Sequence, residues 1–247
     1  MTKPIYALPD IHGHADKLDA ALELIHSDGG PDAEIVFLGD YVDRGPDGAG
    51  VLQRLIDGQA AGRPWTCLMG NHDRMLRRFV VEGVAHDDAI KSGRHWLEPP
   101  LGGRTTLSSY GVGPDIDAPL PPLSEMHEEA RDTVPERHMD FIAGLPLYHQ
   151  RGDVLFVHAG IRPGVPLRDQ AEDDLVWIRQ PFLEHDGPFP WLVVHGHTAL
   201  EVPQHFGNRI DLDGGAGHGR ALYPAVIEGQ NCWLLTKGGR VALSPPI

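Results

Sequence analysis

Side chains that commonly bind metals recur along this chain, each time just after a short apolar run. Candidate ligands follow five such runs, "IYAL", "IVFL", "TCLM", "LFV" and "LVV", and they are Asp10, His12, Asp40, Asn71, His158 and His195. A single aspartate after a strand is usually a turn residue or a helix cap. Turn chemistry does not call for histidine, however, so these positions together predict a metal site.

The ligand types narrow the choice of metal. Carboxylate, imidazole and amide oxygen are present without thiolate, a mixture that suits Mn²⁺, Fe or Zn²⁺. The imidazoles make an all-oxygen Mg²⁺ or Ca²⁺ site a poorer fit. Because one ion needs fewer ligands than these, we expect two divalent ions about 3.5–4 Å apart that share a carboxylate, as in phosphate-ester chemistry. Mn²⁺ is our first choice.

Opposite charges lie close together in the segment "GDYVDRG", residues 39–45. Asp40, Asp43 and Arg44 follow directly after the apolar run "EIVFL". Burying charges of both signs at the end of a strand is costly unless each finds a partner. We therefore expect other groups to pair with them.

The elements that must position these residues begin with a repeated strand–helix pattern. Residues 4–8, 34–38 and 65–69 read as strands, and residues 14–30 and 48–62 have helical apolar spacing and end in glycine. This βαβαβ order predicts parallel strands with crossover helices. In such sheets ligands bind at the carboxyl ends of the strands, where the candidate ligands lie.

The rest of the chain divides into a helical middle and a strand-rich end. Residues 74–98 and 124–143 look helical, and the Pro- and Gly-rich residues 99–123 read as a loop. We expect residues 74–143 to be an insertion near the site entrance, within a single domain spanning 1–247. Strand-like runs resume at 154–158, 191–195, 209–213, 225–228, 232–236 and 240–243. The last four are closely spaced with Gly-rich turns, which predicts an antiparallel sheet.

Composition limits the class of protein and its partners. Of the 247 residues, 41% are hydrophobic, which is enough for a substantial core. The sequence has no run of about 18 apolar residues, so it predicts no membrane-spanning helix. The formal net charge of −14 argues against nucleic acid or an anionic membrane as a partner. Cys67 and Cys232 are expected to be reduced core residues. Without a signal-peptide pattern at the N-terminus, the sequence predicts a cytoplasmic protein.

Five short motifs occur in order between residues 10 and 198: "DIHGH", "GDYVDRG", "GNHD", "VHAG" and "VVHGHT". This set resembles the metal-dependent serine/threonine phosphoprotein phosphatases, in particular their compact bacterial members, within the calcineurin-like metallophosphoesterase superfamily. The resemblance implies an α/β fold, a two-sheet β-sandwich flanked by helices, with a dimetal site at the carboxyl ends of the strands. One departure is Pro9, where the family usually has glycine, so the first turn is expected to differ slightly.

The family pattern implies a metal-binding role for six residues. They are Asp10 and His12 at the first ion, Asp40 as the bridge, and Asn71, His158 and His195 at the second. His197 matches a position described as supporting the site, and it is left out of the ligand set.

Four further residues would handle the phosphate and the proton. The resemblance implies that His72 is the general acid, held by Asp43, and that Arg44 and Arg179, in "LVWIR", contact phosphate. Metal and arginines would attract a dianionic phosphate even to an acidic chain. Two alternatives stay open: His72 as a further metal ligand, since it adjoins Asn71, and Arg179 as a surface arginine.

These features predict a dimetal-dependent phosphomonoesterase in which a metal-bridging hydroxide attacks phosphorus directly. The substrate would be a phosphorylated protein or a small phosphoester, with phosphoserine and phosphothreonine favoured and phosphotyrosine as a further class. The alternative is a symmetrical bis(5′-nucleosyl)-tetraphosphate hydrolase, but that branch usually carries glutamine where this chain has His12. A catalytically inactive metal-binding scaffold is disfavoured because every proposed ligand and the Asp43–His72 pair are present.

Overall fold

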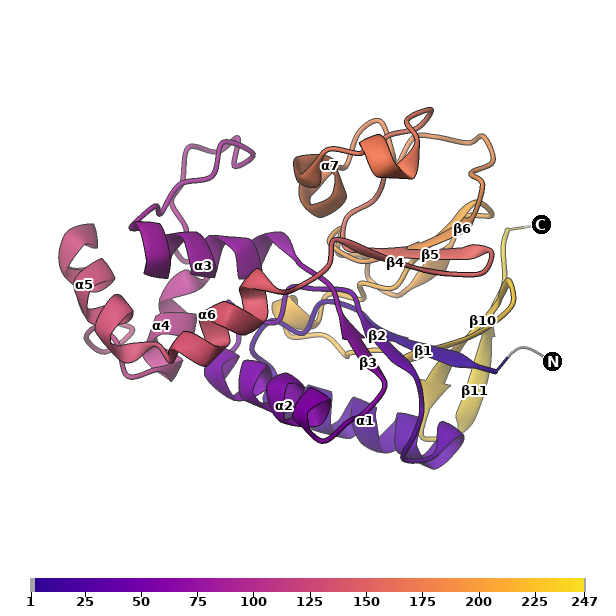
Figure 1. The fold of residues 1–247 in the computed structure, drawn as a ribbon, viewed down its shortest axis with the longest axis horizontal. Coiled ribbons are helices and arrows are strands. Elements are labelled where there is room, and N and C mark those ends of the chain that lie inside the picture. The colour runs from indigo at the N-terminus through magenta and orange to yellow at the C-terminus, as the bar shows by residue number, and fades with distance from the viewer. Residues whose placement is uncertain (1–2, 247) are drawn as a thin grey trace.

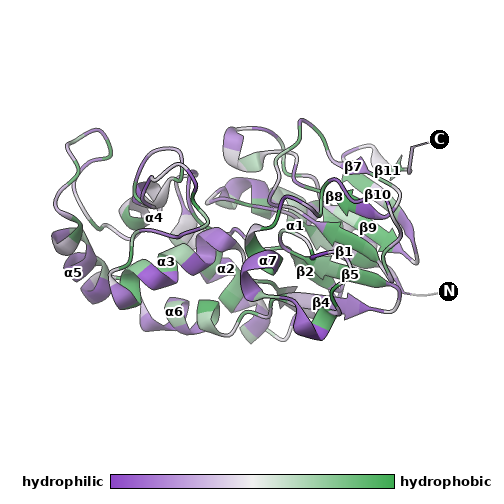
Figure 2. Cartoon of the chain, turned by 90° about the horizontal axis from the view of Figure 1, so that it is seen from above, coloured by the Kyte–Doolittle hydropathy of each residue, from purple (hydrophilic) through white to green (hydrophobic). Residues whose placement is uncertain are grey.

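Two mixed β-sheets form the centre of residues 3–246, the part of the chain that the computed structural model describes (Figure 1). Side chains from both sheets meet in one buried cluster that includes Ala7, Val36, Phe156, Val194 and Ile210. Strands in the middle of the sheets, such as β1, β2 and β5, are predominantly hydrophobic (Figure 2). This two-sheet sandwich flanked by helices confirms the predicted fold class.

The first sheet has six strands in the order β11–β10–β9–β1–β2–β3. The strands are β1 Ile5–Leu8, β2 Ile35–Phe37, β3 Trp65–Cys67, β9 Ala225–Glu228, β10 Asn231–Thr236 and β11 Gly239–Leu243. β1, β2 and β3 are parallel and are connected by helices α1 (Ala15–Gly29) and α2 (Gly48–Ala60). The predicted βαβαβ start is therefore confirmed, as is the antiparallel arrangement of β9, β10 and β11.

The second sheet has five strands in the order β4–β5–β6–β8–β7. The strands are β4 Tyr148–Arg151, β5 Val154–Val157, β6 Leu192–His195, β7 Gln204–His205 and β8 Arg209–Asp211. The expectation that residues 209–213 join the C-terminal antiparallel strands is wrong, because β8 pairs in parallel with β6 and places Asp211 opposite His195. All three residues of β8 are buried, which suits a strand with neighbours on both sides.

The middle of the chain folds into four helices instead of the expected two. They are α3 Asn71–Glu82, α4 Gly103–Ser109, α5 Leu123–Thr133 and α6 Glu136–Ala143. α3 ends earlier than expected because Gly83, with φ 71°, adopts a left-handed cap and donates its N–H to the Phe79 carbonyl. α4 lies inside the predicted loop. Pro135 separates α5 from α6, since its ring cannot continue a helix that begins before it.

The remaining elements are short. Helix α7 spans Glu172–Trp177, and 3₁₀ turns occupy Leu167–Asp169 and Ala216–His218. No helix in the described part of the chain is long and apolar enough to cross a membrane. Cys67 and Cys232 are buried and unpaired, as predicted.

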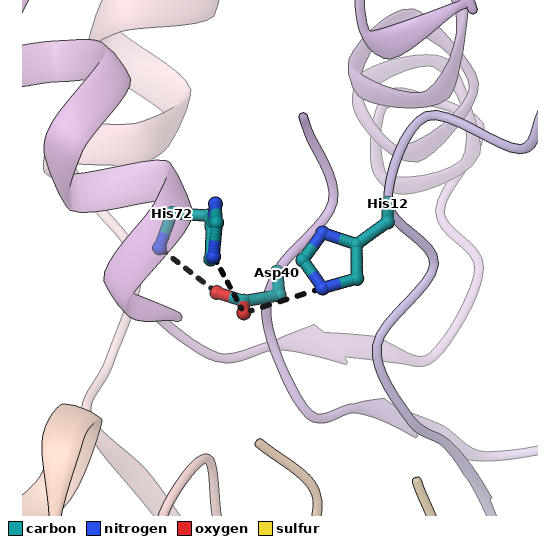
Figure 3. A group of neighbouring side chains, drawn as sticks. All are labelled: His12, Asp40 and His72. Atoms are coloured by element: carbon teal, nitrogen blue, oxygen red, sulfur yellow. Dashed lines mark hydrogen bonds and ion pairs between the residues drawn. The ribbon is translucent and has the colours of Figure 1, made fainter. Parts of the chain in front are cut away.

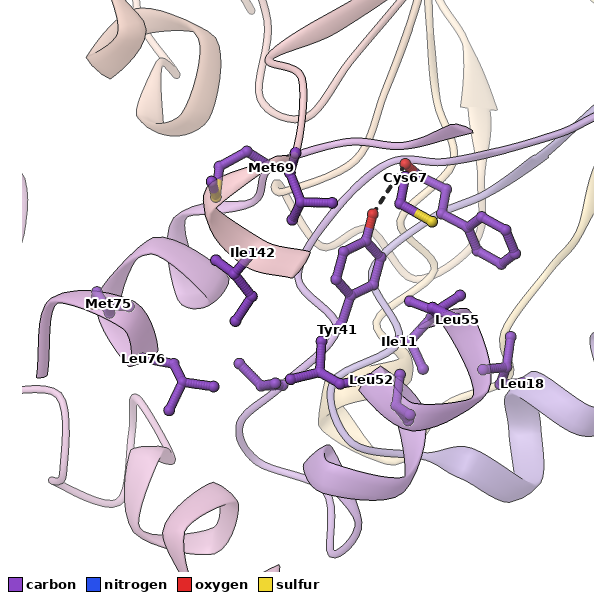
Figure 4. Packing of buried hydrophobic residues seen from close by; sticks show 14 of the residues in the cluster. Ile11, Leu18, Tyr41, Leu52, Leu55, Cys67, Met69, Met75, Leu76 and Ile142 are labelled. Carbon is purple, nitrogen blue, oxygen red and sulfur yellow. Dashed lines mark hydrogen bonds between the residues drawn. The ribbon is translucent and has the colours of Figure 1, made fainter. Parts of the chain in front are cut away.

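The turn that follows β2 packs into the hydrophobic core that helices α1 and α2 cover. Leu52 and Leu55 of α2 lie close to Tyr41 of the "GDYVDRG" segment, and Leu18 of α1 belongs to the same cluster (Figure 4). The Tyr41 hydroxyl donates to the Leu68 carbonyl at 2.7 Å. Each fully buried apolar side chain contributes about 1.5–3 kcal/mol. The core therefore holds the backbone that carries Asp40 and Asp43.

Candidate metal centre

Polar side chains that follow β1, β2, β3, β5 and β6 are buried together, although they come from distant parts of the sequence. The buried residues are Asp10, His12, Asp40, Asn71, His72, His158, His195 and His197. Buried polar groups need hydrogen-bond partners or a bound ligand. The partners of each side chain therefore show what the cluster can hold.

Left-handed backbone conformations concentrate at the same place. Within residues 3–246, the non-glycine residues with φ between 48° and 74° are His12, Asp40, Asp43, Arg44 and His197. Residues with a Cβ rarely adopt this conformation, and it persists where the surrounding structure enforces it, often at functional sites. Four of these five residues were predicted site residues, and the fifth is His197.

Asp73, the third residue of α3, holds the strained turn after β2. Its Oδ2 accepts from the Asp40 N–H at 2.8 Å, and its Oδ1 accepts from the Tyr41 N–H at 2.9 Å. Oδ2 also accepts from the Gly70 N–H at 3.0 Å. This buried carboxylate thus joins the ends of β2 and β3, a positioning contact that the sequence interpretation missed.

Asp40 lies at the centre of the cluster, among histidines from three other segments. Its Oδ2 is 3.7 Å from His12 Nε2 and 4.0 Å from His72 Nε2 (Figure 3). Its Oδ1 is 3.5 Å from His158 Nε2 and accepts from the backbone N–H of His72 at 2.9 Å. Burial raises the pKa of Asp40 to about 7. A positive partner is therefore needed to keep this carboxylate ionised at neutral pH.

Hydrogen bonds at the δ nitrogens of two histidines orient their ε nitrogens toward the cluster. His158 Nδ1 donates to the Leu38 carbonyl at 2.8 Å, and His12 Nδ1 donates to the Val42 carbonyl at 2.9 Å. Each Nε2 therefore presents a lone pair, and that of His158 lies 2.9 Å from Asn71 Oδ1. Acceptors that converge in this way are the surroundings of a cation.

The imidazole nitrogens and carboxylate oxygens of this cluster are suited to bind divalent metal ions. His197 Nε2 is buried and has no hydrogen-bond partner. The Arg44 guanidinium already faces two of the lone pairs, 2.6 Å from His12 Nε2 and 3.2 Å from His72 Nε2. Two triads have ligand atoms within 4.8 Å of one another, His12–Asp40–His72 and Asp40–His158–His197. Asp40 belongs to both triads, which is the position of a carboxylate shared by two ions.

Asp10 adds a further carboxylate to the cluster. Its two oxygens accept from the backbone N–H of His197 at 3.0 and 3.1 Å, and its Oδ2 is 3.9 Å from His12 Nε2. Burial and the nearby Asp213 raise the pKa of Asp10 well above its ordinary value. Asp213, 4% exposed, follows β8 and was missed because no histidine marks that stretch.

The two histidines of "VVHGHT" have different surroundings. His195 Nδ1 lies 3.0 Å from the Gly196 carbonyl, and its Nε2 lies 3.4 Å from an Arg209 nitrogen. Burial and the neighbouring Arg209 lower the pKa of His195 to about 3. His197 instead lies with its ring centroid 5.0 Å from that of His158. The structure thus brings His197 into the cluster and leaves His195, the predicted ligand, outside both triads.

His72 and Asp43 form a buried pair. His72 Nδ1 lies 2.5 Å from Asp43 Oδ2, which also accepts from Trp96 Nε1 at 2.6 Å. Thr106 Oγ1 donates to Asp43 Oδ1 at 2.7 Å and accepts from the Asp43 N–H at 2.7 Å. Burial raises the pKa of Asp43 to about 7, while burial and Arg44 lower that of His72. No sequence motif marks Trp96 or Thr106, which hold Asp43 toward His72.

An open cavity of about 680 Å³ leads to the cluster. Its lining includes Asp40, Arg44, Asn71, His72, Arg179 and His197. Both arginines that were predicted to bind phosphate therefore face the same space as the candidate ligands. Arginine forks match phosphate oxygens in geometry and charge, so this cavity suits an anionic phosphoester.

Curated relatives of this chain carry the names of dinucleotide hydrolases. The chain is 29% identical over 208 residues to a symmetrical bis(5′-nucleosyl)-tetraphosphatase of Acidovorax sp. strain JS42, covering 84% of this chain and 58% of that protein. It is 25% identical over 243 residues to an asymmetrical bis(5′-nucleosyl)-tetraphosphatase of Geobacillus thermodenitrificans, covering 86% of each. The chain thus spans little more than half the length of the Acidovorax relative.

Solved structures share the fold. A proposed diadenosine tetraphosphatase aligns with a TM-score of 0.64 and 22% identity over 99% of this chain and 95% of its own. A cold-active protein tyrosine phosphatase aligns with a TM-score of 0.64 and 20% identity over 99% and 80% of the two chains. The family model for calcineurin-like phosphoesterases matches residues 3–218. Because that match covers most of the sequence, the chain belongs to the calcineurin-like phosphoesterase family.

Proposed function

We propose that this chain is a metal-dependent phosphoesterase that hydrolyses bis(5′-nucleosyl) tetraphosphates. The observation that carries the proposal is the pair of acceptor triads that share Asp40 beside two arginines in one cavity. The curated relatives supply the substrate class, since both are named for dinucleoside tetraphosphates. They favour this alternative over the phosphoprotein substrate that the motifs first suggested.

The role of His12 bears on the main objection to this substrate. The sequence argument against dinucleotides was that this position usually carries glutamine in that branch. His12 Nε2 lies 3.7 Å from Asp40 Oδ2, so we assign this side chain to metal binding, a role that either substrate class would need. A histidine here is therefore compatible with a dinucleotide.

We assign the metal ligands from the family pattern together with the geometry of the cluster, and we keep His72 as the proton donor although it belongs to one of the two triads. Asp10 and His12 would hold one ion, Asn71 and His158 the other, and Asp40 would bridge them. We further propose that His197, with its unpartnered buried Nε2, supplies the imidazole that the sequence interpretation assigned to His195. Two divalent ions held there would activate water and neutralise charge on the phosphate.

The chain's own side chains would then hold the substrate and move the proton. Arg44 and Arg179 would fork onto non-bridging phosphate oxygens and stabilise the charge that develops in the transition state. His72 would donate a proton to the leaving oxygen, with its ring fixed by Asp43 at 2.5 Å. A nucleoside polyphosphate leaves more readily than an alkoxide, so this acid matters most for alkyl esters.

A substrate panel tests the proposed function. The full chain, loaded with Mn²⁺, is assayed on diadenosine tetraphosphate, a phosphoserine peptide and p-nitrophenyl phosphate. We expect kcat/KM for the dinucleotide to exceed that for the peptide by about tenfold or more, a difference of at least about 1.4 kcal/mol. A preference for the peptide would overturn the proposal. The products, two ADP or AMP with ATP, decide between symmetrical and asymmetrical cleavage.

A further inference from the structure

A second cavity, of about 620 Å³, shares Arg44 with the cavity described above. Its walls come from residues 97–105, from the loop around Ile116 and Leu120, and from Gly217 and His218. The volume lies in the range of small-molecule sites, which are mostly apolar with a few polar groups. Leu97, Pro99, Pro100, Ile116 and Leu120 give this cavity the same character.

The wall of this cavity lies directly against the candidate metal centre. A Cβ added to Gly217 would stand 2.4 Å from the His12 ring, and one added to Gly102 would stand 2.4 Å from the backbone nitrogen of Arg44. The Arg44 N–H also donates to the Gly102 carbonyl at 3.4 Å. Because Arg44 lines both cavities, a phosphate held by its guanidinium would lie beside this one, and the group attached to that phosphate could enter it.

Two features of the lining indicate which group that is. Ile116 is 44% exposed at the rim of the cavity, so its apolar side chain is accessible to a ligand there. Arg104 donates through Nη2 to the Asp115 carbonyl at 2.6 Å, but its buried Nε has no partner. The cavity thus offers apolar surface for a flat ring, and the Arg104 guanidinium in its lining supplies positive charge for an attached ribose or phosphate.

We propose that this cavity binds one nucleoside of the substrate, with its base against Ile116 and Leu120 and its ribose-phosphate toward Arg104. The assignment rests on the proposed function, because a dinucleoside tetraphosphate carries two nucleosides that flank the phosphates. Two cavities that meet at Arg44 match such a substrate. A phosphopeptide would instead need partners for its backbone, whereas the buried side-chain donors without a partner at this cavity are the Nε atoms of two arginines, Arg44 and Arg104.

The test replaces Ile116 by glutamate, which places a charge where the base would lie. ADP and inorganic pyrophosphate are compared as inhibitors of p-nitrophenyl phosphate hydrolysis, and KM is measured for diadenosine tetraphosphate. In the wild-type chain we expect ADP to inhibit about tenfold more tightly than pyrophosphate, because the base buries apolar surface. Ile116→Glu should remove most of this preference and raise KM about tenfold. KM and Ki do not depend on the fraction of active protein.

Matched variants separate the cavity from general effects of the substitution. Val241→Glu makes the same kind of change at a residue that is 53% exposed on β11. It should change neither the preference for ADP over pyrophosphate nor the KM for diadenosine tetraphosphate. Ile116→Leu keeps the apolar rim and should retain the preference for ADP. Equal inhibition by ADP and pyrophosphate in the wild-type chain, or equal behaviour of Ile116→Glu and Val241→Glu, would overturn the assignment.

Failure of the cavity and failure of the proposed function give different results. If the wild-type chain cleaves diadenosine tetraphosphate but Ile116→Glu changes neither KM nor the inhibition ratio, the function stands and the cavity assignment falls. If the wild-type chain does not cleave the dinucleotide but prefers ADP, and Ile116→Glu loses that preference, the nucleoside site stands and the proposed substrate falls.

Discussion

Asp43 is oriented by side chains that are distant in sequence. Trp96 Nε1 and Thr106 Oγ1 donate to its two oxygens, at 2.6 and 2.7 Å. With these bonds in place, the Asp43 carboxylate meets His72 Nδ1 at 2.5 Å and fixes the ring. Trp96 and Thr106 lie in the segment that the sequence analysis expected to shape the entrance. Their contacts show that part of this segment orients Asp43, which in turn contacts His72, the proposed proton donor.

Trp96→Phe removes the donor to Asp43 and keeps an aromatic ring in the core, where Trp96 is fully buried. We expect kcat to fall about tenfold on an alkyl phosphate and much less on p-nitrophenyl phosphate, with KM little changed, because general acid catalysis matters most for poor leaving groups. Steady-state kinetics on both substrates measure the difference.

Two further variants serve as controls for the Trp96→Phe result. His72→Ala should give the same substrate pattern with a larger loss, about 10²-fold or more on the alkyl ester. Trp233→Phe, on β10 and without a contact to the pair, should change neither substrate. Equal losses on both phosphates in Trp96→Phe would mean that Trp96 acts only through packing.

The proposed assignment of His197 in place of His195 shows what residue patterns cannot reveal. Alternation along a strand places positions 195 and 197 on the same face. The left-handed φ of 67° at His197 redirects the chain just after β6 ends. Because this conformation depends on the surrounding structure and not on the residue type, the sequence alone could not say which ring faces Asp40.

At the scale of elements, predictability follows the hydrophobic pattern. Strands β1, β2, β5 and β6 are short buried apolar runs and were expected at the correct positions. β4 reads "YHQR" and is largely exposed, and β7 has two residues, so neither has a pattern to detect. The partner of β8 was predicted wrongly because burial on both faces does not identify the neighbouring strand.

Helix α6 is tied to α2 and α4 through one buried histidine. His138 Nδ1 lies 2.7 Å from the Tyr110 hydroxyl, and its Nε2 lies 3.2 Å from Gln53 Oε1. The side chain is 3% exposed, and burial lowers the pKa of His138 to about 4. The folded state therefore holds this ring neutral at pH values where the unfolded chain protonates it.

The sign of the resulting pH dependence is fixed by this lowered pKa. Between the folded value of about 4 and the unfolded value of about 6.5, the unfolded chain binds more protons, so acidification destabilises the fold. We expect the free energy of unfolding of the wild-type chain to fall by about 2 kcal/mol more than that of His138→Gln between about pH 7 and about pH 5. Urea denaturation at both pH values measures this difference, and parallel losses in both proteins would contradict it.

At the scale of the whole molecule, one continuous hydrophobic cluster joins the strand–helix start of the chain to its helical middle segment. It contains Leu8 and Leu18 from the strand–helix start and Trp96, Leu107 and Ile142 from the middle segment. This continuity supports our proposal that residues 1–247 form a single domain. It also explains how residues of the middle segment reach the site.

Metal binding is expected to stabilise the whole fold. Asp10, Asp40 and Asp213 are buried near one another, and bound cations would offset their repulsion. Ions present at about 100 times their Kd would add about 2.7 kcal/mol per site, so a chelator should lower Tm by several degrees. Differential scanning calorimetry measures the shift. Asp40→Asn should show a smaller shift, and an equal shift in both proteins would place the stabilising ion elsewhere.

The number of Mn²⁺ ions bound per chain, measured by equilibrium dialysis and elemental analysis, tests the dimetal centre most directly. We predict about two ions for the wild-type chain, two for His195→Gln and about one for His197→Ala, since His197 and not His195 belongs to a triad with Asp40. Circular dichroism of each variant confirms that it is folded. A wild-type chain that binds one ion or none, or a loss of metal in His195→Gln but not in His197→Ala, would contradict the proposed centre.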